Sequence, residues 1–160
     1  IRDMRKRFEQ QMLLGRVAIE DLEIPTTIRI GPIPALAVSL QQLFLTPELS
    51  EELFEILESK IFPSNNKVGR PGMELWHIFV LSQVRQALDV SYDQLHYMAN
   101  YDKIVRMIMG VENLHGLENE MFGYQAIVEN VGLIDEEMLI KINAVIVSFG
   151  HQILKKKRRH

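Results

Sequence analysis

The sequence contains no cysteine, and this absence excludes whole classes of structure. None of the 160 residues can form a disulfide or give a thiolate to a metal site. The chain also lacks any run of about 18 to 20 uninterrupted apolar residues, the length that a membrane-spanning helix requires. Its first residues do not resemble a signal peptide. We therefore expect a soluble, cytoplasmic protein with no membrane partner.

Motifs of the common enzyme sites are absent as well. The chain has no His-Glu-x-x-His motif, no phosphate-binding glycine loop and no Gly-x-Ser-x-Gly motif. Its histidines do not fall at metal-ligand spacing with one another. We assign no catalytic residue and no metal ligand, and we expect no small-molecule substrate. A small hydrolase that uses Glu and His pairs is kept only as a third alternative.

Charge is distributed unevenly along the chain. A composition of 47% hydrophobic and 24% charged residues is typical of one soluble domain with a substantial core. The net charge of -3 conceals basic ends, at 1–16 and 155–159, and an acidic stretch at 111–137 that has no Lys or Arg. A basic end can bind DNA by neutralising phosphates. The alternative is that the basic tail is only solvated charge.

Apolar residues recur at helical spacing along almost the whole chain. We therefore expect an all-α fold, a multi-helix orthogonal bundle with an extended N-terminal arm and a long C-terminal helix. The expected helices cover 3–14, 34–45, 47–60, 73–88, 92–100, 102–109, 124–131 and 135 onward. The expected units are an N-terminal helix and arm (1–33), a helical core (34–134) and a C-terminal helix with the basic tail (135–160).

Helix starts and stops are marked by familiar residues. Thr46 is expected as an N-cap, and the proline that follows it suits the first helical position. Ser91 and Gln94 have the spacing of a capping box. Asp135 is expected to cap the last helix. Gly110 is expected to end the helix at 102–109.

Residues 73–101 have the pattern of a helix-turn-helix unit. Such a unit needs a buried first helix, a short turn and a second helix with one polar face. On a helical wheel the polar face of the second helix carries Asp93, Tyr97, Asn100 and Tyr101, flanked by Gln94 and His96. Asn and Gln can pair with adenine, and Tyr hydroxyls commonly contact phosphate. The negative charge of Asp93 opposes a close approach of DNA.

Further cations lie on either side of this pattern. The Gly-Arg-Pro stretch of the hinge at 63–73 contains Arg70, and Lys67 precedes it; such a stretch can place an Arg in a minor groove. The alternative is that the hinge only leads into a buried helix. Lys103 and Arg106 are spaced three residues apart on the helix after the polar face and so share one side of it.

Five short stretches, in order and spacing, resemble the N-terminal helical region of bacterial insertion-sequence transposases outside the main named families. They are RFEQQM (7–12), TPEL (46–49), GRPGMELW (69–76), YDQLHYMAN (92–100) and GYQAI (123–127). The resemblance implies a region that binds the ends of the element and helps assembly. It also implies a separate ribonuclease-H-like catalytic domain, whose Asp, Asp and Glu hold two metal ions.

This chain stops about where that catalytic domain should begin. We therefore expect no enzyme activity and no cofactor in this fragment, with divalent metal needed only by the absent domain. The expected partners are double-stranded DNA and a second copy in a homodimer. The candidate DNA-binding residues are Lys67, Arg70, Arg85, Gln94, Tyr97, Asn100, Lys103 and Arg106. The alternative function is a helical dimerisation or protein-interaction module, which the overall acidity favours.

Overall fold

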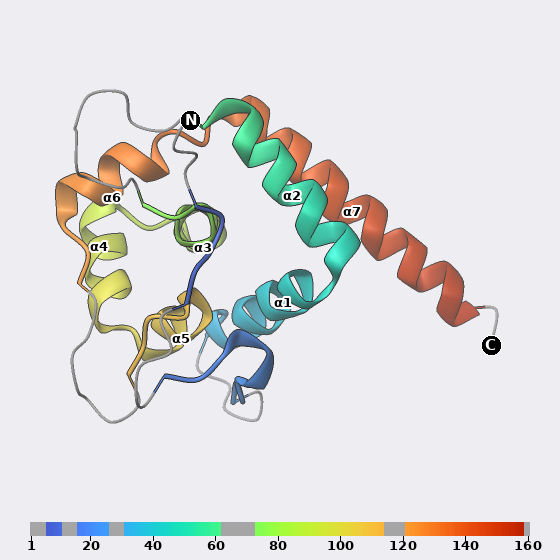
Figure 1. Cartoon of the computed structure of the whole chain (residues 1–160), viewed down its shortest axis with the longest axis horizontal. Helices are drawn as coiled ribbons and strands as arrows, with labels where there is room; N and C mark the ends of the chain where they lie inside the picture. Colours follow the sequence, from blue (N-terminus) through green and yellow to red (C-terminus); the bar gives the residue numbers. More distant parts are fainter. Residues whose placement is uncertain (1–5, 11–15, 26–30, 62–72, 114–120, 159–160) are drawn as a thin grey trace.

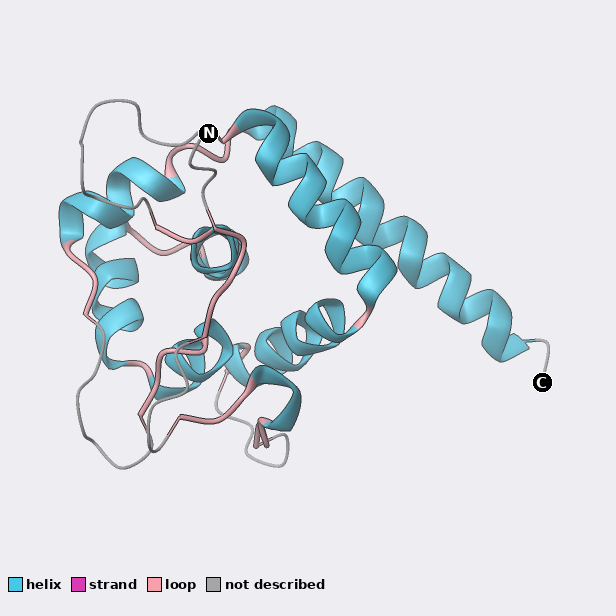
Figure 2. Ribbon diagram, in the orientation of Figure 1, coloured by secondary structure: helices cyan, strands magenta, loops and turns pink. Residues whose placement is uncertain are grey.

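The computed structural model describes residues 6–10, 16–25, 31–61, 73–113 and 121–158, with side chains described as far as Ser148. Within these ranges the regular elements are helices and there is no strand (Figure 2), which confirms the all-α prediction. They are a short 3-10 helix, η1 (Ile19–Asp21), and the α-helices α1 (Ile33–Leu45), α2 (Pro47–Lys60), α3 (Leu75–Leu88), α4 (Tyr92–Tyr101), α5 (Lys103–Met109), α6 (Tyr124–Val131) and α7 (Glu136–Arg158).

Helix α3 lies at the centre of the bundle. Figure 1 views it along its axis, with the other helices arranged around it. Its sequence is apolar on nearly all sides, and every residue from Leu75 to Ser82 is buried, as expected for a helix that neighbours surround. Trp76 packs against Phe44 of α1 and Phe79 of its own helix, with ring centroids 4.9 and 5.9 Å apart. The core is therefore organised around α3.

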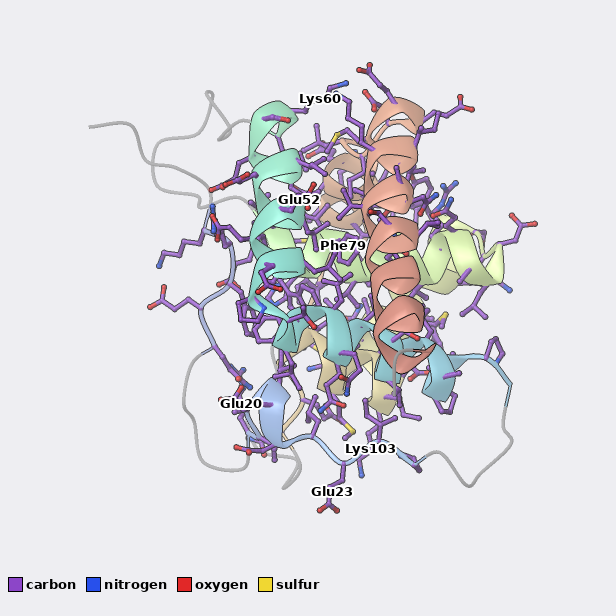
Figure 3. The ribbon with its side chains drawn as sticks, turned by 90° about the vertical axis from the view of Figure 1, so that its right-hand side faces the viewer. Glu20, Glu23, Glu52, Lys60, Phe79 and Lys103 are labelled. Carbon is purple, nitrogen blue, oxygen red and sulfur yellow. The ribbon has the colours of Figure 1, made fainter. Side chains whose placement is uncertain are left out.

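Helices α2 and α7 lie side by side, as Figures 1 and 3 both show. On the α7 side, Met138 and Ile142 are buried in the contact. Lys60 at the end of α2 forms an ion pair with Glu137 at the start of α7, with Nζ and Oε2 2.8 Å apart. The two helices run in opposite directions, and α7 continues past the start of α2, away from the rest of the molecule (Figure 1).

The N-terminal segment differs from its prediction. A helix was expected over 3–14, but residues 6–10 are not helical; the rest of that expected helix, 3–5 and 11–14, lies outside the described residues. The carbonyls of Lys6 and Arg7 accept hydrogen bonds from the backbone N–H groups of Leu75 and Trp76, at 3.0 and 2.9 Å. The first N–H groups of a helix have no partner within the helix. Lys6 and Arg7 supply those partners to α3 from a segment that is not helical.

Side chains hold this segment against three helices. Arg7 forms ion pairs with Glu51 and Glu58 of α2, each at 2.6 Å. Phe8 packs edge-to-face on Phe44 of α1 and His77 of α3, with centroids 5.6 and 5.8 Å apart. The apolar residues that suggested an amphipathic helix instead belong to a non-helical segment that crosses the bundle.

Residues 16–25 continue as an arm over the bundle. Ile19 in η1 is fully buried. The side-chain amide of Gln41 in α1 donates hydrogen bonds to the carbonyls of Ile19 and Leu22, at 2.9 and 3.0 Å. A buried polar side chain thus satisfies two backbone carbonyls of a non-helical segment, which fixes the arm to α1.

The helix termini follow the sequence in most places. The capping box of Ser91 is present, Asp135 Oδ1 accepts from the N–H of Met138 at 2.8 Å, and α5 ends at Gly110 in the left-handed conformation. Thr46 does precede α2, but its side chain makes no capping bond. Its hydroxyl instead donates to the carbonyl of Gln42 in the preceding helix at 2.7 Å. Thr46 is therefore the N-cap residue by position, as predicted, but its side chain does not form the cap.

Candidate nucleic-acid interface

Helix α4 is held firmly in the bundle, which fixes the direction of its outer face. Leu95 and Ala99 are fully buried on its inner side. A turn at Asp89, which is left-handed with φ of 50°, joins α3 to α4. The N–H of Gln94 donates to Ser91 Oγ at 3.2 Å, and the N–H of Ser91 donates to Gln94 Oε1 at 3.1 Å. These caps anchor the first turn of α4.

The capping box limits what Gln94 can do. Its side chain is exposed at the surface, as predicted, but its carbonyl oxygen already accepts from the Ser91 backbone. Bidentate reading of adenine needs both the oxygen and the amide nitrogen of a glutamine. Such reading by Gln94 would compete with the cap, whereas a single donated hydrogen bond would not.

Two tyrosines dominate the outer face of α4. Tyr97 and Tyr101 are 64% and 65% exposed. They lie one helical turn apart, and their rings stack with centroids separated by 5.2 Å and planes tilted by 38°. Tyrosines this exposed present both an aromatic face and a hydroxyl to a partner. Here the outward direction predicted for these residues agrees with the structure.

Asn100 does not belong to this outer face, so its assignment as a DNA contact is wrong. The residue is 6% exposed. Its Nδ2 donates to the carbonyl of Phe122 at 2.9 Å, and its Oδ1 accepts from the N–H of Phe122 at 2.7 Å. The helical wheel failed at this position because the segment before α6 covers that side of α4.

Arg106 is also an interior residue, so it too is corrected as a DNA contact. It is 2% exposed. Its Nε donates to Glu112 Oε1 at 2.9 Å, and its guanidinium donates to the carbonyl of Ala99 at 2.8 Å. A buried arginine needs a charged partner and acceptors of this kind. Arg106 therefore ties α5 to α4 and to the segment that follows Gly110.

The other two predicted DNA-binding cations that the structure describes, Arg85 and Lys103, are at the surface. Arg85, near the end of α3, is exposed and lies over the ring of Tyr92 with its Cζ 4.2 Å from the centroid. A guanidinium stacked on a ring keeps its in-plane N–H groups for other acceptors. Lys103 is exposed at the start of α5. Figure 3 shows Lys103 at the same end of the molecule as Glu20 and Glu23, so the charge there is mixed.

The other predicted basic positions lie outside the described structure. Lys67 and Arg70 fall in the undescribed range 62–72, and the side chains of the tail at 155–159 are likewise outside it. The placement of Arg70 in a minor groove therefore stays a prediction. The DNA-binding role of the α3–α4 pair stays one too.

Two aromatic side chains of α3 perform a role that the sequence did not indicate. Trp76 Nε1 donates to the carbonyl of Ile108 at 2.8 Å, and His77 Nε2 lies 3.0 Å from the carbonyl of Met109. The last carbonyls of a helix have no partner within it, so these bonds complete the end of α5. Burial lowers the pKa of His77 to about 4, which keeps its ring neutral.

The segment before α6 and the first residue of α6 add surface residues that sequence reasoning missed. Met121 and Tyr124 are exposed, and Tyr124 packs edge-to-face on His96 of α4, with centroids 5.8 Å apart. The hydrogen bonds between Asn100 and Phe122 hold this segment beside α4. Since the pairing joins residues 22 apart in the sequence, no local spacing predicts it.

The described residues were also compared with the requirements of a metal site and of a membrane span. Within the described ranges, no group of three or more His, Asp or Glu side chains is placed to hold a metal ion. No helix in the same ranges has both the length and the apolar character needed to cross a bilayer. Comparison with known proteins finds no matching family model, no matching curated protein and no matching solved structure.

Proposed function

We propose that this chain is a DNA-binding and assembly domain of a transposase, which binds duplex DNA at the ends of its element without catalysing a reaction itself. The sequence resemblance motivates the proposal. The observation that carries it is the outer face of α4, where Tyr97 and Tyr101 are exposed on a helix that is anchored from its other side.

A rigid face is what recognition of a duplex requires. Leu95 and Ala99 fix the inner side of α4, and the Ser91 cap fixes its start. The outer side chains are therefore presented without a large loss of conformational entropy on binding. A helix presented in this way after a short turn has the size to enter a major groove.

The exposed groups have the chemistry of phosphate and base contacts. The hydroxyls of Tyr97 and Tyr101 can donate to phosphate oxygens, and Gln94 can donate from its amide nitrogen. Arg85 and Lys103 add positive charge before and after α4. Arg is especially suited to phosphate because its N–H groups form a planar fork.

Asp93 is the opposing element, because its carboxylate is exposed on the same helix. A carboxylate repels phosphate, so α4 would have to approach with Asp93 away from the backbone or near a cytosine amine. This restriction predicts a weak interaction for the isolated chain, one that depends on the sequence of the duplex.

Fluorescence anisotropy with a labelled duplex of the element's end, and a scrambled duplex as control, tests the proposal across a salt series. We expect Tyr97→Ala and Tyr101→Ala to weaken binding to the terminal duplex. We expect Arg85→Ala and Lys103→Ala each to lower the salt slope by about one unit, as for the loss of one phosphate contact.

Lys6→Ala is the matched control, because Lys6 is an exposed cation on the N-terminal segment rather than on the face around α4. Circular dichroism confirms that each variant is folded. Equal slopes for Lys103→Ala and Lys6→Ala, or unchanged binding in both tyrosine variants, would contradict the proposed face.

A specific observation favours a second candidate, a protein-interaction module. Met121 and Tyr124 are exposed, and Tyr124 packs on His96 of α4, so exposed apolar side chains lie beside this helix. Exposed apolar patches commonly mark protein interfaces. If the parent chain binds neither duplex at low salt, this alternative replaces the first.

A further inference from the structure

Helix α7 has apolar residues on two opposite sides, and α2 covers only one of them. Met138 and Ile142 are buried toward α2. On the far side, Ile140 and Val147 are 63% and 57% exposed, although both are large aliphatic residues. Ala144 lies between them and is exposed too. A surface helix normally shows polar residues on its solvent side, so this second apolar stripe needs an explanation.

The spacing of the stripe is that of a coiled-coil seam. Ile140, Ala144 and Val147 are separated by four and then three residues; the next four-residue step falls on His151, and the three-residue step after it reaches Leu154. The helix itself continues to Arg158. Apolar residues at alternating four- and three-residue steps keep one stripe facing a partner helix that has the same repeat.

We propose that this stripe is the surface on which a second copy of the chain docks, as a parallel, in-register pair of α7 helices. The equivalent residues of the two copies would meet across a two-fold axis, which makes the interface self-complementary. The seam begins at Ile140, because Glu137 at the preceding seam position is already paired with Lys60.

Charged residues beside the stripe fit this arrangement. With Ile140 and Val147 at d positions, Glu136 falls at a g position and Lys141 at the following e position. In a parallel pair these two positions of opposite chains are neighbours. Glu136 would therefore lie near the second copy's Lys141, and the reverse, which gives two attractive pairs. Lys141 is exposed, and its contact with Glu137 in its own helix is 3.5 Å long, so it is available for exchange.

The body of the molecule does not obstruct the pairing. Helix α2 contacts the side of α7 that carries Met138 and Ile142, opposite to the stripe. The two bodies would consequently lie on the outer sides of the helix pair. This surface gives a location to the assembly part of the proposed function, but it rests on separate residues and is tested without DNA. A failure of DNA binding and a failure of dimerisation are therefore distinguishable.

The absence of cysteine allows a direct test by cross-linking. A chain carrying Val147→Cys is left under mild oxidation, and dimer is measured on a non-reducing gel. Parallel, in-register helices bring the two equivalent seam positions together, so we expect efficient disulfide-linked dimer. Gln86→Cys, an exposed position on α3, is the matched control and should give only background. Equal cross-linking of both variants would overturn the proposal.

Sedimentation equilibrium of the parent chain over a wide concentration range provides the second test. We expect a reversible monomer–dimer equilibrium that Ile140→Asp shifts to monomer, while Gln86→Asp on α3 leaves it unchanged. Glu136→Lys alone should weaken the dimer, and adding Lys141→Glu should restore it. Circular dichroism checks that the helices of each variant are intact. A parent chain that is monomeric at every concentration, or a dimer unaffected by Ile140→Asp, would overturn the proposal.

Discussion

The side chain of Asn100 in α4 pairs with the backbone of Phe122 through two hydrogen bonds, donating to its carbonyl at 2.9 Å and accepting from its N–H at 2.7 Å. The amide thus imitates the pairing of a neighbouring strand for a segment that belongs to no regular element. A third bond runs from Nδ2 to the carbonyl of His96 at 2.9 Å. The pairing fixes the segment before α6 against α4.

We predict that Asn100→Ala destabilises the fold and does not act by removing a DNA contact. The substitution leaves the N–H and carbonyl of Phe122 without their partner, at a cost of about 1 to 3 kcal/mol. Urea unfolding followed by circular dichroism measures the change. Tyr101→Ala, at the adjacent exposed position, should change the free energy of unfolding by less than about 0.5 kcal/mol. Similar losses in both variants would contradict this role for Asn100.

Substitutions of Arg106 and Lys103 should also differ in their effect on the free energy of unfolding, although the two residues are three positions apart on one helix. Arg106→Met leaves the carboxylate of Glu112, which is itself mostly covered, without its ion pair. We expect a loss of about 3 kcal/mol in the free energy of unfolding, the lower end for a broken buried pair. Lys103→Met should be nearly neutral because Lys103 is exposed. Thermal or urea unfolding of the two variants checks the difference, and a neutral Arg106→Met would be the contrary result.

The free energy of unfolding should decrease as the pH is lowered, because of His77. Its folded-state pKa is lowered to about 4 by burial, whereas the unfolded chain takes up a proton near pH 6.5. Between these values the unfolded state binds more protons, so the free energy of unfolding decreases as the pH falls. The full effect is about 3 kcal/mol, reached near pH 4.

Unfolding titrations of the parent and of His77→Gln between pH 7.5 and about 4 measure this term. Glutamine retains an N–H donor for the carbonyl of Met109 but does not titrate. The pH dependence that the exposed carboxylates contribute is common to both proteins and cancels in the comparison. Parallel curves for the two proteins would show that His77 is not responsible.

Gly110 should be far less tolerant of alanine than Gly31, although both have positive φ, of 77° and 72°. A Cβ on Gly110 would lie 2.6 Å from Cζ of Phe8, whereas a Cβ on Gly31 meets nothing within 4 Å. Phe8 has little room to move because it packs against Phe44 and His77. Each substitution carries a backbone cost of about 1 kcal/mol, and Gly110→Ala adds the clash. Equal unfolding free energies for the two variants would refute this.

Local patterns in the sequence determined the helices. The apolar period set the all-α class, and the Ser91, Asp135 and Gly110 signals gave the ends of three helices, because capping depends on residues only a few positions apart. The exposed positions of Tyr97 and Tyr101 followed from the same period. These features need no knowledge of what packs where.

Only the tertiary structure decided which polar residues are buried. Asn and Arg are residue types that commonly make surface contacts. Asn100 and Arg106 are nevertheless covered by segments that are distant in the chain or lie beyond a turn, and their side chains form hydrogen bonds with those segments. Residues 6–10 read as helical, yet they are not helical, and two of them supply partners for the first N–H groups of α3. In each case the deciding partner comes from another segment, and a periodicity measured within one segment contains no information about its neighbours.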